Sequence, residues 1–222
     1  MIPDMTPDRS NEILQRFLPV PERDPKSYLR NPFRMGDDDF VCATNRHMIV
    51  AIPLTVALMR GVYFDDIDAS EPKEFMRAVS KILSASINAP SNPDLWRDLP
   101  DLPALSPCPA CRGSGVRHVV PCSLCAGTGQ DVHRTYVCDC TKCSGSGEIY
   151  AEAGGEQHVC WDCNGMKVDL GDSVVIADAR FCLAYLHILR DIGAKLHITG
   201  RDTASFFRTD DLAYGAIMPM RY

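Results

Sequence analysis

The sequence of 222 residues has no hydrophobic run long enough to cross a membrane. A membrane-spanning helix needs about 20 apolar residues in succession. The longest apolar stretch, residues 48–59, is shorter than that and contains Pro53. The first residues also lack the basic segment and the apolar core of a secretory signal peptide. We therefore expect a cytoplasmic protein without a membrane partner.

Catalytic motifs are missing as well. The sequence contains no Ser/His/Asp arrangement, no glycine-rich phosphate loop and no pair of carboxylates placed for acid–base chemistry. Acidic residues cluster at 37–39 and 65–68, which is typical of solvated turns, with divalent cation binding as the weaker alternative. We expect that the protein is not an enzyme.

Basic residues are fewer than acidic ones in this chain. The chain has 23 Lys and Arg against 29 Asp and Glu, a formal net charge of -6. Tight nonspecific binding of nucleic acid depends on basic side chains that neutralise phosphates. The charge therefore does not favour DNA as a partner, although a local basic stripe could still bind it.

Cysteine, by contrast, is abundant. The chain has 11 cysteines, and nine of them lie between Cys108 and Cys163. An odd number in a protein without an export signal argues against a disulfide scaffold, because cytosolic thiols are kept reduced. The cluster indicates metal binding instead.

Eight of these cysteines form four Cys-x-x-Cys pairs, each followed by glycine. The pairs are Cys108 and Cys111, Cys122 and Cys125, Cys140 and Cys143, and Cys160 and Cys163. Two pairs complete one tetrahedral site, so four pairs predict two structural Zn²⁺ ions. The glycines let the backbone fold back until its N–H groups reach the sulfur atoms. Redox-active dithiols and an iron–sulfur cluster are the alternatives.

Residues 108–167 resemble the central cysteine-rich zinc domain of DnaJ-type chaperones, whose signature is four copies of CxxCxGxG. In that family the first pair joins the fourth and the second joins the third. The resemblance therefore implies one site of Cys108, Cys111, Cys160 and Cys163, and another of Cys122, Cys125, Cys140 and Cys143. Lys167 replaces the last glycine of the fourth copy, and Cys138 is left over as a competitor of Cys140. The His-Pro-Asp tripeptide of a J domain is absent, which argues against a co-chaperone.

The rest of the chain alternates between helical and extended patterns. Apolar residues at helical spacing predict helices at residues 10–18, 70–87 and 181–192. Extended patterns predict short strands between residues 28 and 53, and at residues 173–177, 195–199, 204–208 and 214–220. Five prolines make residues 88–107 an extended spacer. The C-terminal order is β, α, β, β, β, and the first sixty residues look like the same unit with its opening strand short or missing.

Two short segments resemble the bacterial sliding clamp, the beta subunit of DNA polymerase III. Residues 40–49 are similar to the Ala-Thr-Asp-Gly-His-Arg-Leu segment of that family, and residues 218–221 look like its C-terminal Met-Pro-Met-Arg. A clamp domain is a pair of βαβββ units, so the resemblance implies an α+β fold with one clamp-like domain formed by residues 1–60 and 170–222. Residues 61–107 are then a helix plus a Pro-rich connector, and the zinc module at 108–167 is an insertion.

In the clamp family these two segments help to form a pocket that captures peptides of replication proteins. The resemblance implies protein binding by Thr44, His47, Met218, Pro219, Met220 and Arg221. Asn45, Arg46 and Met48 depart from the family pattern. Ordinary alternation in a core strand for the methionines, and a turn position for the histidine, are the alternatives.

These features favour a non-enzymatic, zinc-binding, clamp-like adaptor that binds protein or DNA in replication or repair, in a phage or mobile-element setting. One alternative is a chaperone-like scaffold whose zinc module binds protein clients, and a weaker one is thiol–disulfide exchange. Rings of the clamp family close with six domains, so encirclement of DNA by this chain would require a hexamer. Light scattering, which counts subunits, tests that arrangement.

Overall fold

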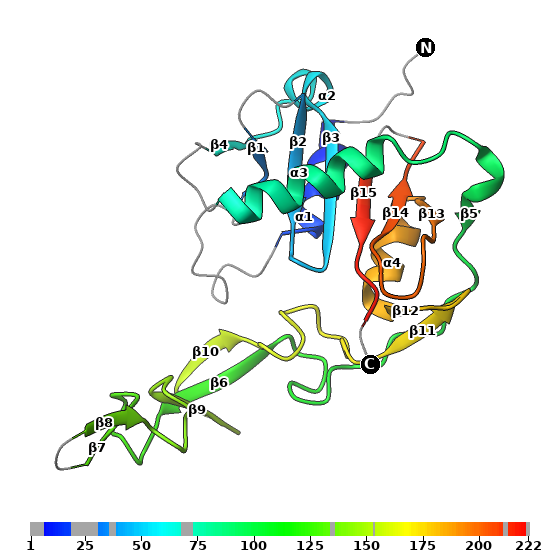
Figure 1. The fold of residues 1–222 in the computed structure, drawn as a ribbon. Coiled ribbons are helices and arrows are strands. Elements are labelled where there is room, and N and C mark those ends of the chain that lie inside the picture. Colours follow the sequence, from blue (N-terminus) through cyan, green and yellow to red (C-terminus); the bar gives the residue numbers. More distant parts are fainter. Residues whose placement is uncertain are drawn as a thin grey trace. The chain divides into compact units, whose positions relative to one another are not determined.

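The computed structural model describes residues 7–18, 31–35, 39–67, 73–133, 136–152, 154–210 and 213–220. The chain divides into two compact units (Figure 1). The first contains Met1–Ser106 and Leu170–Tyr222, and the second contains Pro107–Asp169. Within the described residues, none of the helices combines the length and the apolar character needed to span a membrane.

An eight-stranded sheet forms the centre of the first unit. In sheet order its strands are β4 (Asp65–Ile67), β1 (Phe33–Met35), β2 (Phe40–Thr44), β3 (Met48–Pro53), β15 (Tyr214–Ile217), β14 (Ser205–Arg208), β13 (Lys195–His197) and β5 (Arg97–Asp98). All neighbours are antiparallel except β1 and β4, which run parallel. The two ends of the chain share this sheet because β3 pairs with β15, with Met48 opposite Ile217.

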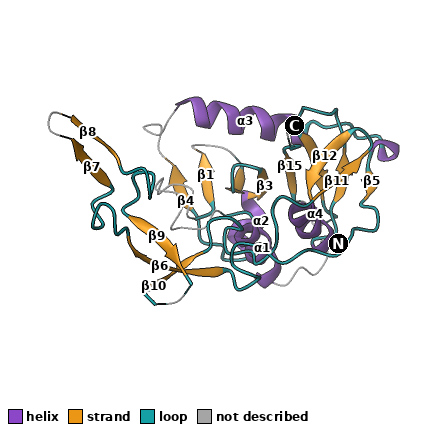
Figure 2. Ribbon diagram, turned by 90° about the horizontal axis from the view of Figure 1, so that it is seen from below, coloured by secondary structure: helices purple, strands orange, loops and turns teal. Residues whose placement is uncertain are grey.

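Helices cover both faces of the large sheet (Figures 1 and 2). They are α1 (Pro7–Arg16), α2 (Leu54–Met59), α3 (Lys73–Ile87) and α4 (Leu183–Asp191). On the face covered by α3, Val79 packs in a buried cluster with Ile49, and Phe206 lies against that cluster. On the opposite face, which α1 and α4 cover, Phe17 stacks on Phe207 with ring centroids 5.7 Å apart. The two neighbouring phenylalanines of β14 thus point to opposite faces, as strand geometry requires.

Most of the predicted elements of this unit are confirmed. The three predicted helices correspond to α1, α3 and α4, and the predicted strands to β1, β2, β3, β13, β14 and β15. Residues 70–72, with which the second predicted helix begins, lie outside the described residues. The strand predicted at 173–177 exists as β11 (Ser173–Ile176), but it pairs with β12 (Ala179–Cys182) in a separate two-stranded sheet. The fold class is mixed α+β, and its division into two βαβββ halves stays a prediction.

Residues 61–107 do more than form the helix and connector that the sequence predicts. β4 pairs with β1 and β5 pairs with β13, so this segment supplies both outer strands of the large sheet. Directly before β5, the indole Nε1–H of Trp96 donates to the Pro90 carbonyl at 2.8 Å, and the Arg208 guanidinium carbon lies 4.2 Å from the centroid of the Trp96 ring. The prolines flank the two paired residues of β5, so a proline-rich segment can still add a short edge strand.

The second unit holds a three-stranded sheet and a two-stranded one. Its strands are β6 (Val116–Pro121), β7 (Gln130–His133), β8 (Tyr136–Asp139), β9 (Glu148–Ala151) and β10 (Glu156–Val159), paired as β10–β6–β9 and β7–β8. Val119 apart, the buried hydrophobic side chains among its described residues are all cysteines. A unit this small with so little apolar burial needs another source of stability, which bound metal commonly supplies.

Candidate metal centres

The eight predicted ligands gather into two groups of four. The first tetrad is Cys108, Cys111, Cys160 and Cys163, and the second is Cys122, Cys125, Cys140 and Cys143. Within each tetrad the four sulfur atoms all lie within 4.8 Å of one another. The grouping is the one that the resemblance to the DnaJ-type domain implies. Two cysteine tetrads are therefore positioned to bind metal ions, consistent with two zinc sites.

The sulfur separations fit a tetrahedral ion. Zn–S bonds of about 2.3 Å place the ligands of a tetrahedron about 3.8 Å apart. In the first tetrad, the Sγ atoms of Cys108 and Cys160 are 4.0 Å apart, and those of Cys111 and Cys163 are 3.7 Å apart. The corresponding separations in the second tetrad are both 3.8 Å. Four thiolate ligands leave no coordination position open, so such a site stabilises structure and does not bind substrate.

Each cysteine pair lies in a tight turn that a backbone hydrogen bond to sulfur closes. The N–H groups of Gly115, Gly129 and Gly147 each donate to the second cysteine of their own turn, at 3.3 Å. These glycines have φ of 80°, 76° and 81°, in the left-handed region that glycine adopts without strain. Hydrogen bonds of this kind favour the thiolate, which is the form that binds metal.

Two turns meet in each tetrad through a reciprocal pair of backbone hydrogen bonds. In the second tetrad the Cys122 N–H donates to the Gly147 carbonyl at 2.8 Å, and the Cys140 N–H donates to the Gly129 carbonyl at 2.9 Å. In the first tetrad the equivalent bonds run from Cys108 to Lys167 and from Cys160 to Gly115, at 2.9 and 2.8 Å. The two sites therefore share one backbone arrangement.

Lys167 takes the last glycine position of the fourth turn and keeps its geometry. Its φ is 69°, and its N–H bonds the Cys163 sulfur. A side chain in this left-handed conformation costs about 1 kcal/mol. We expect Lys167→Gly to stabilise the first tetrad by roughly 0.5–1 kcal/mol without changing the metal content, because the strain is removed.

Metal release during titration with a chelator measures this effect. Lys142→Gly is the matched control, since Lys142 lies in the third turn and is not among the residues with positive φ. This control should weaken the second tetrad. Easier metal release from Lys167→Gly than from the wild-type protein would contradict the interpretation.

Hydrogen bonds and burial separate the thiol pKa values within each tetrad. Burial raises the pKa of Cys111, but the Gly115 N–H and neighbouring thiols outweigh it and lower this pKa to about 6. The pKa of Cys125 is lowered to about 6 in the same way, with the bond from Gly129 opposing burial. Burial prevails at Cys163 and Cys140, raising their pKa to about 12 and about 11. Thiolates at these separations repel one another, so a cation is needed before all four lose their protons.

Cys138 belongs to neither tetrad. It lies on β8 opposite Asp131 of β7, half-buried, with its thiol directed to the Asp131 carbonyl at 3.7 Å. Cys140 is the residue whose sulfur lies in the second tetrad, 3.8 Å from that of Cys122.

The residues predicted to bind protein fall into two groups. His47 is exposed, its carbonyl accepts the Met218 N–H at 2.8 Å, and its ring stacks on Tyr185 with centroids 5.7 Å apart. Met218 and Met220 are half-buried and Pro219 is buried between them. The sequence did not single out Tyr185, whose place in a helical stripe indicated only core packing.

Thr44 plays a different part, since it is buried and holds the turn between β2 and β3. Its hydroxyl donates to the Met48 carbonyl at 2.7 Å and accepts the Arg46 N–H at 3.1 Å. Arg46 has φ of 73°, so it keeps the conformation that glycine would take there. Arg221 lies outside the described residues.

The described arginine side chains of α1 and α4 are engaged with their neighbours. The Arg16 guanidinium bonds Glu12 at 2.6 Å and Asp191 at 3.2 Å. Arg190 donates to His187 Nδ1 at 2.8 Å, and the opposite ring nitrogen of His187 lies 2.8 Å from the Pro103 carbonyl. The Arg9 side chain lies outside the described part of the chain. Arg16 is thus balanced by two carboxylates, whereas Arg190 is bonded to a histidine.

The predicted acidic turns add no metal site in the described part of the chain. Asp65 accepts hydrogen bonds from Asn31 Nδ2 and from the Tyr63 hydroxyl, each at 3.0 Å. Asp37, Asp38 and Asp68 lie outside the described residues. Among the residues that are described, the two cysteine tetrads are the groups that could hold an ion.

No family model and no curated protein matches the chain. Among solved structures, the DNA polymerase III subunit beta from Pseudomonas aeruginosa is similar at a TM-score of 0.33 and 12% identity, covering 98% of this chain and 65% of that chain. The DNA polymerase sliding clamp from Pseudomonas aeruginosa with ligand is similar at a TM-score of 0.34 and 12% identity, covering 98% of this chain and 66% of that chain. The chain thus spans slightly less than two thirds of the length of these structures. Scores this low add nothing to the resemblance read from the sequence.

Proposed function

We propose that the protein is a non-enzymatic, zinc-stabilised, clamp-like adaptor that binds a protein partner in DNA replication or repair, in a phage or mobile-element setting. The first unit provides the binding surface. The second unit is held together by two zinc ions.

The observation that supports this proposal is that the two clamp-like segments lie side by side. They are far apart in the sequence, yet the pairing of β3 with β15 continues into the bond between the Met218 N–H and the His47 carbonyl at 2.8 Å. Beside this bond lie the stacked rings of His47 and Tyr185. An aromatic pair bonded through the backbone to a segment with two half-buried methionines is well suited to bind an apolar peptide.

A protein partner is favoured over DNA. The net charge is -6, and each zinc tetrathiolate would add two further negative charges, so the loaded protein carries about -10. Arg16 is already bound to Glu12 and Asp191. DNA binding that weakens steeply with salt would contradict this preference.

The proposal is tested with a fluorescent peptide from a replication protein that binds the bacterial sliding clamp. We expect the peptide to bind, and Met220→Ala to weaken its binding about tenfold, since a buried apolar anchor is worth more than 1 kcal/mol. Fluorescence anisotropy measures the dissociation constant.

Met59→Ala is the matched control, because this methionine of α2 is 77% exposed and belongs to neither of the two clamp-like segments. It should leave the dissociation constant unchanged. Equal losses in both variants, or no binding by the wild-type protein, would disprove the adaptor function.

A further inference from the structure

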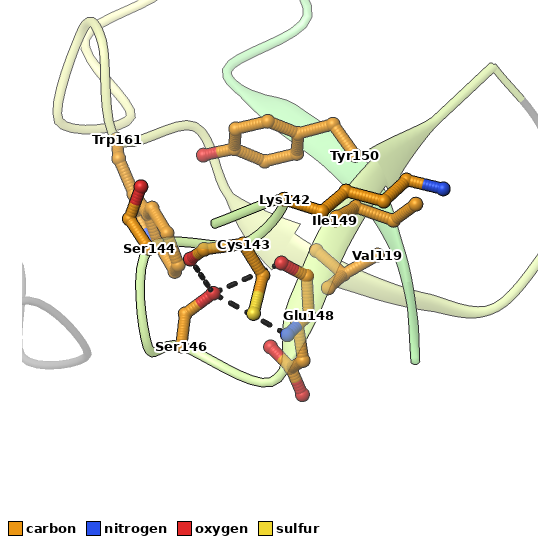
Figure 3. A pocket seen from close by; sticks show the side chains of 9 residues that line it. All are labelled: Val119, Lys142, Cys143, Ser144, Ser146, Glu148, Ile149, Tyr150 and Trp161. Atoms are coloured by element: carbon orange, nitrogen blue, oxygen red, sulfur yellow. Dashed lines mark hydrogen bonds between the residues drawn. The ribbon is translucent and has the colours of Figure 1, made fainter. Parts of the chain in front are cut away.

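The second unit contains a cavity of about 310 Å³ beside Cys143 of the second tetrad (Figure 3). Val119 and Ile149 line it together with the rings of Tyr150 and Trp161. Glu148 and Lys142 supply the charged groups at its edge. All of these residues lie within the second unit, whereas His47 belongs to the first.

The aromatic walls are held in place by contacts of their own. The Tyr150 and Trp161 rings meet edge to face, with centroids 5.5 Å apart and an interplanar angle of 62°. The Arg117 guanidinium carbon lies 3.3 Å from the Tyr150 ring centroid, and its NH1 lies 3.4 Å from Asp162 Oδ2. Arg117 does not line the cavity, so it does not fill it.

Tyr150 and Asp162, beside the cavity, already bind one guanidinium group. Arg117 is stacked on an aromatic ring and paired with a carboxylate. The cavity presents the same two kinds of group, namely the rings of Tyr150 and Trp161 and the carboxylate of Glu148. Aromatic faces attract cations, and a planar guanidinium can stack on a ring while it donates to a carboxylate.

Glu148 is the negatively charged residue among those that line the cavity. The Lys142 ammonium donates to the Ser123 hydroxyl at 2.8 Å, outside the cavity lining. The Glu148 side chain is 43% exposed, and one of its oxygens lies 3.9 Å from Nδ1 of His158. Residues 107–169 contain five Lys and Arg against seven Asp and Glu, and two zinc tetrathiolates would bring this net charge of -2 to about -6. Charge complementarity therefore favours a basic ligand.

We propose that this cavity binds an arginine side chain of a partner protein, with the guanidinium against Tyr150 and Trp161 and donating to Glu148. The cavity volume lies at the small end of ligand pockets, which suits one side chain of an otherwise exposed peptide. Arginine is favoured over lysine because its weakly hydrated, planar head stacks on rings, whereas an ammonium does not.

Isothermal titration of the zinc-loaded full chain with a capped hexaarginine peptide tests the proposal. We expect binding that Glu148→Gln and Trp161→Leu each weaken about tenfold, and that Lys142→Met strengthens. Glu152→Gln is the matched control, because Glu152 is an exposed carboxylate just beyond β9 that does not line the cavity. It should change the affinity less than twofold. Hexalysine should bind several times more weakly.

Each other outcome counts against the proposal. Equal losses in Glu148→Gln and Glu152→Gln would mean that only the overall charge attracts the peptide. If the protein bound octathymidylate instead of hexaarginine, and Trp161→Leu abolished that binding, the aromatic rings would bind nucleobases and not an arginine. A metal content of two ions in every variant shows that the second unit is intact. The increase in affinity expected for Lys142→Met is a further control, because a misfolded variant would lose affinity.

Discussion

Replacing Cys140 by serine should remove one of two bound metal ions, whereas replacing Cys138 should remove none. The two cysteines are two residues apart in the sequence, yet only Cys140 has its sulfur in a tetrad. A hydroxyl is a poor zinc ligand at neutral pH, and three thiolates hold the ion far less tightly than four. Elemental analysis of the purified variants gives the metal content directly.

Loss of this metal ion should also destabilise the strands around the second tetrad. Binding of a structural zinc ion contributes about 10–16 kcal/mol in small zinc peptides, and that free energy is coupled to folding. The second tetrad closes the segment that contains β7 and β8, so amide protons of these strands should exchange much faster in Cys140→Ser. Those of the large sheet should keep their protection, since that sheet belongs to the other unit.

Cys138→Ser is the control within the same hairpin. It should retain two ions and wild-type exchange, because its sulfur belongs to neither tetrad and is directed to the Asp131 carbonyl at 3.7 Å. Retention of two ions by Cys140→Ser would show that Cys138 can replace it. That result would contradict the assignment of the second tetrad.

The cysteines that form the two tetrads could be predicted from the sequence because their chemistry is local. A Cys-x-x-Cys pair followed by glycine builds half of a site within one turn, whatever surrounds it. Which turns meet is a question of tertiary structure, and spacing alone left it open. The resemblance to the DnaJ-type domain supplied that pairing, and the sulfur positions agree with it. Lys167 kept the turn because a backbone N–H closes it, and the side chain plays no part in that bond.

The edges of the large sheet could not be predicted in this way. β4 and β5 have three and two residues, too few for a periodic pattern to appear. Their pairing depends on neighbours distant in the sequence, β1 for β4 and β13 for β5. The cavity could not be predicted from the sequence for the same reason. Val119, Tyr150 and Trp161 come together only when β6, β9 and the fourth cysteine turn are in place.

Gly215→Ala should destabilise the first unit by about 3 kcal/mol, the upper end of what overpacking in a core usually costs. Gly215 lies on β15 between β14 and β3, and a methyl group there would collide with the Ile49 carbonyl oxygen and with the Phe207 ring. The backbone cannot move away easily, since the Gly215 carbonyl also accepts the Ser86 hydroxyl at 3.1 Å. Urea unfolding followed by the fluorescence of Trp96, which lies in this unit, measures the change.

Gly61→Ala separates this collision from the general effect of losing a glycine. Gly61 has φ of 63° but nothing within 4 Å of the added methyl group, so only the backbone strain of about 1 kcal/mol should appear. Both variants should keep two metal ions, because the tetrads lie in the other unit. If Gly215→Ala unfolded at the same urea concentration as Gly61→Ala, the close pairing of β15 with β3 would be wrong, and with it the joining of the two ends of the chain in one sheet.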